Sequence, residues 1–201
     1  MRLPLFPLHG VLYPGATVPL HIFEPRYREM VGRCLEHDEA FGVVLILEGE
    51  EVGGAAVPHR IGTEAAIIAA QRYRDGRYDL VAEGRRRFEI VSLDPTRAYL
   101  RAEVRFLPEP GGIVSEDLAE TVAILFEGFL ETEERSGHPP VEETWRDLDP
   151  RALSYLIASM LPVSEAAKQE MLELRDASAR LRKVAGHLMA ITRIGAKAGA
   201  A

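Results

Sequence analysis

The sequence contains one cysteine, three lysines and no asparagine, and it has no long apolar run. The single cysteine, Cys34, cannot form a disulfide within the chain, which fits a reducing compartment. No apolar stretch approaches the roughly 20 residues needed to span a bilayer, and prolines interrupt the opening residues too early for a signal peptide. These absences lead us to expect a cytoplasmic protein with no membrane partner.

The sequence also lacks a strongly basic region. Its formal net charge is −7 at pH 7, so a large positive surface for nucleic acid is not expected. The one basic run is Arg85-Arg86-Arg87. Because alternate residues of a strand face opposite sides, these three arginines cannot form one patch. Nucleic acid is therefore not an expected partner.

Signatures of catalysis are missing as well, since there is no GxSxG elbow and no GxxxxGK[ST] phosphate loop. Ser164 and Lys168 are spaced like a Ser-Lys pair, but a serine that follows the helix-stopping Pro162 is typical of a helix N-cap, and we expect Lys168 to be solvated. The nearest metal-binding pair, Cys34 and His37, supplies only half of a zinc site. The sequence thus predicts a protein that is not an enzyme and that uses neither metal nor cofactor.

The first half of the chain is patterned like β structure. Residues 100–106 alternate apolar and charged side chains, which predicts a strand with one buried face. Asp75 and Gly76 lie between two apolar runs and are typical of a tight hairpin. Gly84 is expected to break the second of these runs before the pattern resumes. Several short strands at such spacing predict a small barrel.

One helix is expected inside this strand-rich half. Pro25 suits the first position of a helix. The apolar residues that follow repeat at helical spacing and form a single stripe, which comprises Tyr27, Met30, Val31, Cys34 and Leu35. Because Cys34 lies on this stripe, we interpret it as a core residue and not as a reactive thiol.

The segment 108–112, Pro-Glu-Pro-Gly-Gly, can continue neither a strand nor a helix, and beyond it the apolar period changes from two to about 3.6. The sequence therefore predicts an α+β fold. We expect a β-barrel subdomain at 1–112, a bundle of helices at 113–195 and a flexible tail at 196–201. The last helix carries an apolar seam at heptad spacing, and a seam left unfilled within the chain would favour a homodimer.

Motifs along nearly the whole chain resemble the amino-terminal domain family of Lon proteases. The opening blocks of this resemblance are LPLFPL at 3–8, VLYPG at 11–15 and PLHIFEPRYR at 19–28. Further blocks follow in order at 41–45, 61–63, 75–77, 81–88, 164–172 and 180–181. Ala167 stands where the family commonly has a glutamate, which we expect to cost surface charge and not fold. The ATPase and Ser-Lys protease modules that follow this domain in full-length Lon have no counterpart in these residues, so proteolysis is not carried over.

The resemblance implies a PUA-like β-barrel, of the pseudouridine-synthase-and-archaeosine-transglycosylase type, followed by a helical bundle. It also implies a non-catalytic module that recognises unfolded or client polypeptides, as an adaptor for a separate protease or chaperone, or as a holdase. A bulky aromatic pair flanks the strand-to-helix turn at 23–27, so we expect Phe23, Arg26 and Tyr27 to contact polypeptide. The competing interpretation is that these aromatics close the barrel while Arg26 forms an internal ion pair. Alternative functions are nucleic-acid or small-ligand binding through the barrel, and a small-molecule enzyme for which no residue constellation is evident.

Overall fold

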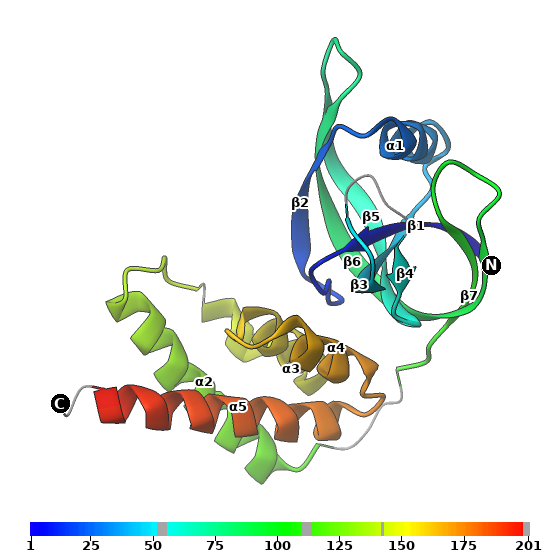
Figure 1. The fold of residues 1–201 in the computed structure, drawn as a ribbon. Helices are drawn as coiled ribbons and strands as arrows, with labels where there is room; N and C mark the ends of the chain where they lie inside the picture. Colours follow the sequence, from blue (N-terminus) through cyan, green and yellow to red (C-terminus); the bar gives the residue numbers. More distant parts are fainter. Residues whose placement is uncertain (52–55, 110–113, 142, 199–201) are drawn as a thin grey trace. The chain divides into compact units, whose positions relative to one another are not determined.

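The computed structural model describes residues 1–51, 56–109, 114–141 and 143–198. The chain forms two compact units (Figure 1): the first comprises Met1–Pro108 and Glu165–Leu172, and the second comprises Glu109–Ser164 and Glu173–Ala201. Strands with one inserted helix come first and helices follow, which is the expected α+β fold. Among the described residues, none of the helices is both long enough and apolar enough to cross a membrane.

Seven strands of the first unit form a sheet that closes into a ring. The strands are β1 (Arg2–Leu8), β2 (Thr17–Ile22), β3 (Phe41–Glu48), β4 (Val57–Pro58), β5 (Ile61–Arg72), β6 (Tyr78–Asp94) and β7 (Arg101–Phe106). The order β1-β7-β6-β5-β3 is antiparallel at each step, and a parallel pairing of β1 with β3 completes the ring. β4 adds to β3, and β2 pairs with β6 outside this path. Ring closure leaves few sheet edges exposed.

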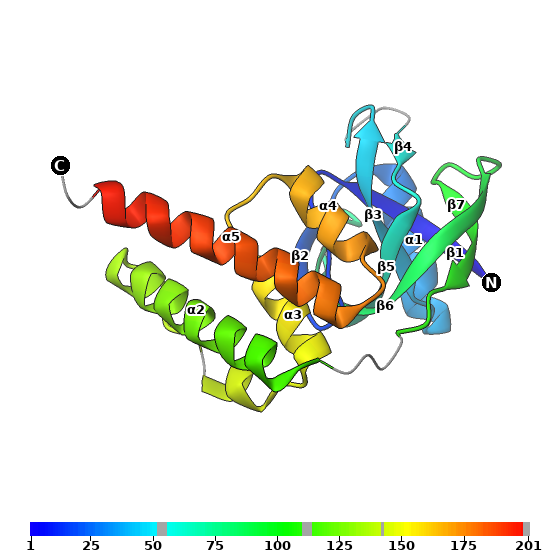
Figure 2. The same cartoon turned by 90° about the horizontal axis from the view of Figure 1, so that it is seen from below.

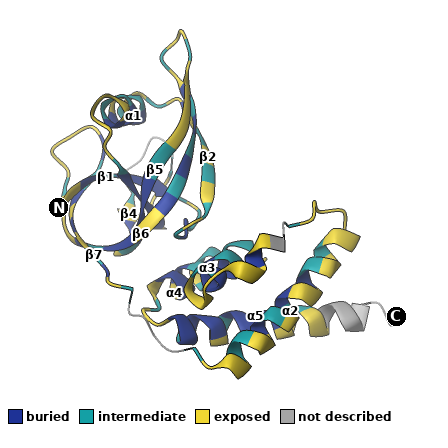
Figure 3. Ribbon diagram, turned by 180° about the vertical axis from the view of Figure 1, so that it is seen from behind, coloured by how far each residue is buried: buried dark blue, intermediate teal, exposed yellow. Residues whose placement is uncertain are grey.

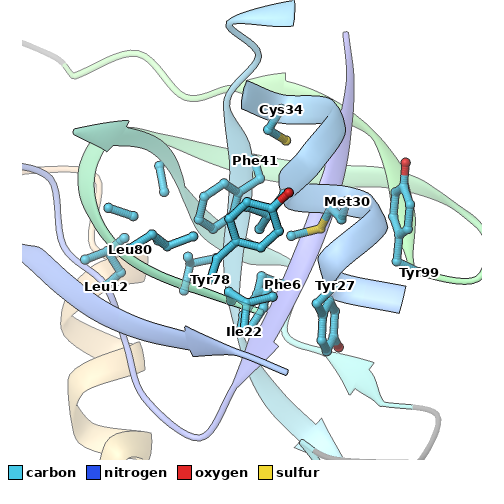
Figure 4. Close-up of a cluster of buried hydrophobic side chains, with 14 residues drawn as sticks. Phe6, Leu12, Ile22, Tyr27, Met30, Cys34, Phe41, Tyr78, Leu80 and Tyr99 are labelled. Atoms are coloured by element: carbon cyan, nitrogen blue, oxygen red, sulfur yellow. The ribbon is translucent and has the colours of Figure 1, made fainter. Parts of the chain in front are cut away.

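The inserted helix, α1 (Pro25–His37), packs on the larger apolar cluster of this unit (Figure 4). It begins at Pro25 as expected, and Tyr27, Met30, Val31 and Cys34 are buried in the cluster. Leu35 differs from the expectation because 42% of it is exposed, at the margin of the stripe. A second cluster, formed by Leu3, Leu5, Val44, Phe88, Ile90, Ala102 and Val104, lies among the strands.

The expected break at Gly84 is wrong, because β6 is one continuous strand from Tyr78 to Asp94. Gly84 instead allows another segment to approach closely. Its carbonyl accepts a hydrogen bond from Gly15 N at 2.9 Å, and its N–H donates to the Ala16 carbonyl at 2.8 Å. A Cβ atom at Gly84 would lie 2.2 Å from the Tyr13 carbonyl oxygen, so only glycine fits here.

The second unit is helical, as Figure 2 shows. Its elements are α2 (Glu116–Arg135), the short 3-10 helix η1 (Glu143–Asp147), α3 (Pro150–Met160) and α5 (Ala177–Ala198). Asp149 caps α3, with the carboxylate accepting a hydrogen bond from Ala152 N at 2.8 Å. Helix α5 extends beyond the expected end at 195, and 199–201 lie outside the described residues.

Helix α4 (Glu165–Glu173) belongs with the sheet from Glu165 to Leu172, although its sequence position suggested the helical subdomain at 113–195. Hydrogen bonds along its length explain this assignment. Glu165 Oε2 accepts from Val11 N at 3.0 Å, the Lys168 carbonyl accepts from the Tyr13 hydroxyl at 2.7 Å, and Gln169 Nε2 donates to the Ile61 carbonyl at 3.0 Å. At the C-terminal end, Nη1 of the fully buried Arg87 donates to the Leu172 carbonyl at 2.6 Å.

Replacing Gly84 by alanine is expected to lower the free energy of unfolding by about 1–3 kcal/mol, because the new Cβ forces the Tyr13 backbone to move. Urea unfolding followed by circular dichroism measures the change. Gly10→Ala is the matched control, since no heavy atom lies within 4 Å of its Cβ position, and its effect should stay within about 0.5 kcal/mol. Equal losses in both variants would contradict this account of Gly84.

Arg87→Met is expected to cost about 2–4 kcal/mol, because the Leu172 carbonyl loses a charged donor in a buried setting. The same unfolding measurement applies. The control is Arg85→Met, which removes a half-exposed pair between Arg85 Nη2 and Glu83 Oε2 at 2.8 Å and should cost at most about 1 kcal/mol. A variant at Arg87 that unfolds like the wild type would show that α4 does not depend on this arginine.

Candidate functional site

The outer face of β2, β6 and β5, which are paired side by side, is a candidate binding surface of the first unit. Burial alternates along β6, so that Tyr78, Leu80 and Ala82 point into the core while Asp79 and Val81 are half-buried on the outer side. The far part of β5, from Ile68 onward, is exposed (Figure 3). One face of this three-stranded section therefore meets solvent.

A hollow of about 510 Å³ lies over this face, and we call it the outer groove. Its floor is a row of apolar side chains from three strands, since Val81 pairs with Pro19 of β2 on one side and with Ala69 of β5 on the other. The groove is lined by Pro19, Leu20, His21, Ala69, Ala70, Gln71, Asp79, Leu80 and Val81. A floor of small apolar side chains is suited to apolar groups of varied shape.

A polar row lies at one end of the outer groove. Asp79 pairs with His21 of β2 and with Gln71 of β5, and the Asp79 carboxylate lies 2.5 Å from His21 Nδ1. The Tyr73 hydroxyl also donates to Asp79. These hydrogen bonds, first from Tyr73 and then from His21, hold the pKa of Asp79 below its usual value. The carboxylate therefore stays ionised, and this end of the groove supplies hydrogen-bonding groups.

Two strand edges flank the outer groove. β2 pairs with β6 alone within the described parts of the chain. The pairing of β3 with β5 ends at Ala65, so the far part of β5 has only β6 beside it among the described strands. Such edges present backbone N–H and carbonyl groups that an extended peptide can pair with.

The three residues expected to contact polypeptide do not converge. Phe23 is 47% exposed and its ring stacks on His21 with centroids 6.0 Å apart, at the margin of the outer groove. The Tyr27 ring is buried against Phe6, with centroids 4.3 Å apart, and burial raises its pKa. Arg26 Nη2 pairs with Glu24 at 3.2 Å, and its guanidinium carbon lies 4.6 Å from the Tyr27 ring centroid.

Arg26 and Tyr27 still share a second, smaller hollow of about 290 Å³ on the same unit, together with Arg97 and Tyr99. Arg26 Nη2 also donates to the Glu51 carbonyl at 3.2 Å, so its position is fixed by several contacts. For Arg26 and Tyr27 these contacts agree with the competing interpretation, because the Tyr27 ring lies in the core and Arg26 forms an ion pair. Phe23 is the member of the trio whose side chain is open to a large ligand.

The other candidate residues occupy ordinary structural positions. Arg87 is buried, Arg86 forms a two-pronged ion pair with Glu64 at 2.8 and 3.0 Å, and Arg85 pairs with Glu83, so the three arginines go to separate places. Lys168 Nζ pairs with Glu165 Oε1 at 3.2 Å. Over the described residues, no group of three or more His, Cys, Asp or Glu side chains is arranged to hold a metal ion.

Sequence reasoning did not find the outer groove. The available signal was the alternation of residues 78–83, which gives β6 two faces. The four alanines among residues 65–70 were a second signal, because small side chains on an outward face leave room for a ligand.

Comparison with known proteins gives a consistent result. Residues 2–190 match the family model of the ATP-dependent protease La (LON) substrate-binding domain. Lon protease 2 of Sorangium cellulosum is 31% identical over 90% of this chain, and Lon protease of Escherichia coli strain K12 is 26% identical over 90%. Each match covers 24% of the relative, so the chain spans about a quarter of the length of these proteins.

Two solved structures share the fold. A Lon N-terminal domain protein from Xanthomonas campestris superposes with a TM-score of 0.70 at 29% identity, covering 92% of this chain and 96% of that one. The N-terminal domain of the Mycobacterium avium complex Lon protease superposes with a TM-score of 0.69 at 21% identity, covering 94% and 98%. The second likeness concerns the fold alone.

The thiol of Cys34 is expected to be inert in the folded protein, because burial raises its pKa to about 11. At pH 8 a disulfide reagent should label it at least about 100-fold more slowly than in urea. Because the pKa of Cys34 is higher in the folded than in the unfolded protein, its contribution to the free energy of unfolding is fully present below about pH 9. This contribution is lost as the pH rises toward 11. Cys34→Ala should abolish that part of the pH dependence, and rapid labelling in native buffer would contradict the burial of this thiol.

Proposed function

Since the chain belongs to the LON substrate-binding domain family, we propose that it recognises unfolded or client polypeptides through the outer groove, without catalysis, as an adaptor or a holdase. The observation that carries this proposal is an apolar hollow over a sheet face that has open strand edges on both sides. The family match supports the class of ligand, and the groove supports the place where it binds.

The groove suits a polypeptide of no fixed sequence for two physical reasons. An extended segment can pair its backbone with the edge of β2 or of β5, and backbone pairing is the same for every sequence. Its apolar side chains can then contact the floor of Pro19, Ala69 and Val81, where small and rigid groups set no strict shape. Recognition would depend on exposed apolar surface, which folded proteins present only in limited patches.

Phe23 stacks on His21 at the margin of the groove, and Ile68 is the neighbour in sequence of the lining residue Ala69. Their side chains are 47% and 52% exposed, and Ile68 lies where the register of β5 against β6 shifts. Large exposed aromatic and aliphatic groups beside a hollow are common anchors for a bound chain. Of the residues expected from the sequence, we retain Phe23 as a direct contact, whereas Arg26 and Tyr27 belong to the neighbouring hollow and support the turn that positions it.

Val81→Asp should weaken binding of a fluorescent, unstructured apolar peptide at least about tenfold, which is about 1.4 kcal/mol, because it places a charge on the apolar floor. Fluorescence anisotropy measures the dissociation constant. Val91→Asp is the matched control, since Val91 is an exposed valine of the same strand that does not line the groove, and its binding should stay within about twofold of the wild type.

Phe23→Ala should weaken the same peptide by about threefold or more while circular dichroism shows an unchanged fold. If Phe23→Ala unfolds the protein, Phe23 is a structural residue and not a contact, and if Val81→Asp and Val91→Asp bind alike, the groove is not the binding site. If the wild type binds no unstructured peptide at all, the proposed function itself is wrong.

A further inference from the structure

A separate hollow of about 440 Å³ lies on the first unit where α1 begins and the β5–β6 hairpin turns. It is lined by Pro25, Arg28, Glu29, Arg72, Gly76 and Tyr78, none of which lines the outer groove. Two arginines and one tyrosine therefore line one opening. Because the chain as a whole carries a net charge of −7, a concentration of positive charge at one hollow requires an explanation.

Arg28 reaches from α1 to the turn of the hairpin. A Cβ atom at Gly76 would lie 2.4 Å from Arg28 Nη2, so the glycine provides the space that this guanidinium occupies. Gly76 has a φ of +84°, which the turn itself requires. Arg28 Nε is buried and has no hydrogen-bond partner. Buried donors are nearly always paired in folded proteins, so this Nε–H is a donor that a water molecule or an ion can satisfy.

Arg72 and Tyr78 complete the set of donors. The guanidinium carbon of Arg72 lies 5.7 Å from the centroid of the Tyr78 ring. Tyr78 is only 5% exposed, and Figure 4 shows its hydroxyl directed toward α1. Within the described parts of the chain, this hydroxyl makes no hydrogen bond and neither Arg28 nor Arg72 has a carboxylate within 4 Å.

The nearest carboxylates are engaged elsewhere. Asp75 accepts a hydrogen bond at 2.8 Å from Arg77 Nε, and its pKa is lowered mainly by hydrogen bonds from Arg77, with a smaller contribution from the charge of Arg28. Glu29 lines the hollow but lies 3.8 Å from Arg97. The first turn of α1 adds the positive end of a helix dipole. The balance of charge at the opening is positive.

We infer that Arg28, Arg72 and Tyr78 form a binding site for a single oxyanion, a carboxylate or a phosphate group. Planar guanidinium groups match the oxygens of such groups, and the phenol supplies a further donor. This inference goes beyond the proposed function, because it concerns a different hollow and requires no polypeptide. Carboxylates occur on acidic side chains and small metabolites, whereas phosphates occur on modified residues and nucleotides, and the two probes below separate these sources.

The test observes the arginine Nε–Hε signals of the full chain by ¹⁵N-resolved nuclear magnetic resonance at constant ionic strength. Inorganic phosphate is the probe in one titration and N-acetylglutamate amide, which carries one carboxylate, in the other. The signals of Arg28 and Arg72 should shift together and saturate. Saturation with both probes assigns the site to oxyanions in general, and saturation with phosphate alone assigns it to phosphate groups.

Variants make the result specific. Arg72→Gln should weaken binding at least about tenfold and Tyr78→Phe by about threefold. Arg74→Gln is the matched control, because Arg74 is an exposed arginine of the same hairpin outside the hollow, and it should change affinity by less than about twofold. Shifts that rise linearly with both probes, or equal losses in Arg72→Gln and Arg74→Gln, would overturn the inference by showing general electrostatic attraction only.

Discussion

The Arg87 guanidinium is wholly buried where α4 ends, and it donates the hydrogen bond that joins that end of the helix to the sheet. Helix ends leave carbonyl groups without partners and carry partial negative charge, so a cation placed there satisfies both. In the second unit Arg180 is also fully buried: it donates to the Leu174 carbonyl at 2.7 Å and to Ser154 Oγ at 2.8 Å. The residue on each side of Glu173, where the chain passes from the first unit to the second, thus has its carbonyl bound by a buried arginine: Leu172 by Arg87 and Leu174 by Arg180. Burying a cation is costly, and these hydrogen bonds offset that cost.

Local sequence predicted those elements whose cause is local. The buried face of α1 repeats at helical spacing, and Pro25 begins that helix. The hairpin at Asp75 and Gly76 needs a positive φ, which glycine supplies. The same reasoning predicted that a helix begins after Ser164 but not what that helix contacts, because the contacts of α4 are single hydrogen bonds to residues far away along the chain, such as the one from the Tyr13 hydroxyl. The residues next to a helix in the sequence do not indicate which distant residues it will contact.

The candidate site shows the same limit. Phe23, Arg26 and Tyr27 are neighbours in sequence, yet a strand-to-helix turn sends Phe23 to the groove margin and Tyr27 into the core. The outer groove is assembled from alternate residues of three strands, so its floor follows from the register of β2 and β5 against β6. Alternation along one strand indicates that an outward face exists. It does not say which outward residues of other strands lie beside it.

The assignment of α4 to the sheet has a consequence for biosynthesis. The last strand of the first unit ends at Phe106, but this unit also includes Glu165–Leu172, so a ribosome must translate the whole of 109–164 before the barrel can be covered. Until then the Ile61 carbonyl and the Arg87 guanidinium lack their helical partners. The two units therefore cannot mature strictly one after the other, and until residues 165–172 have been made, water must hydrate the polar groups of the barrel that α4 later binds.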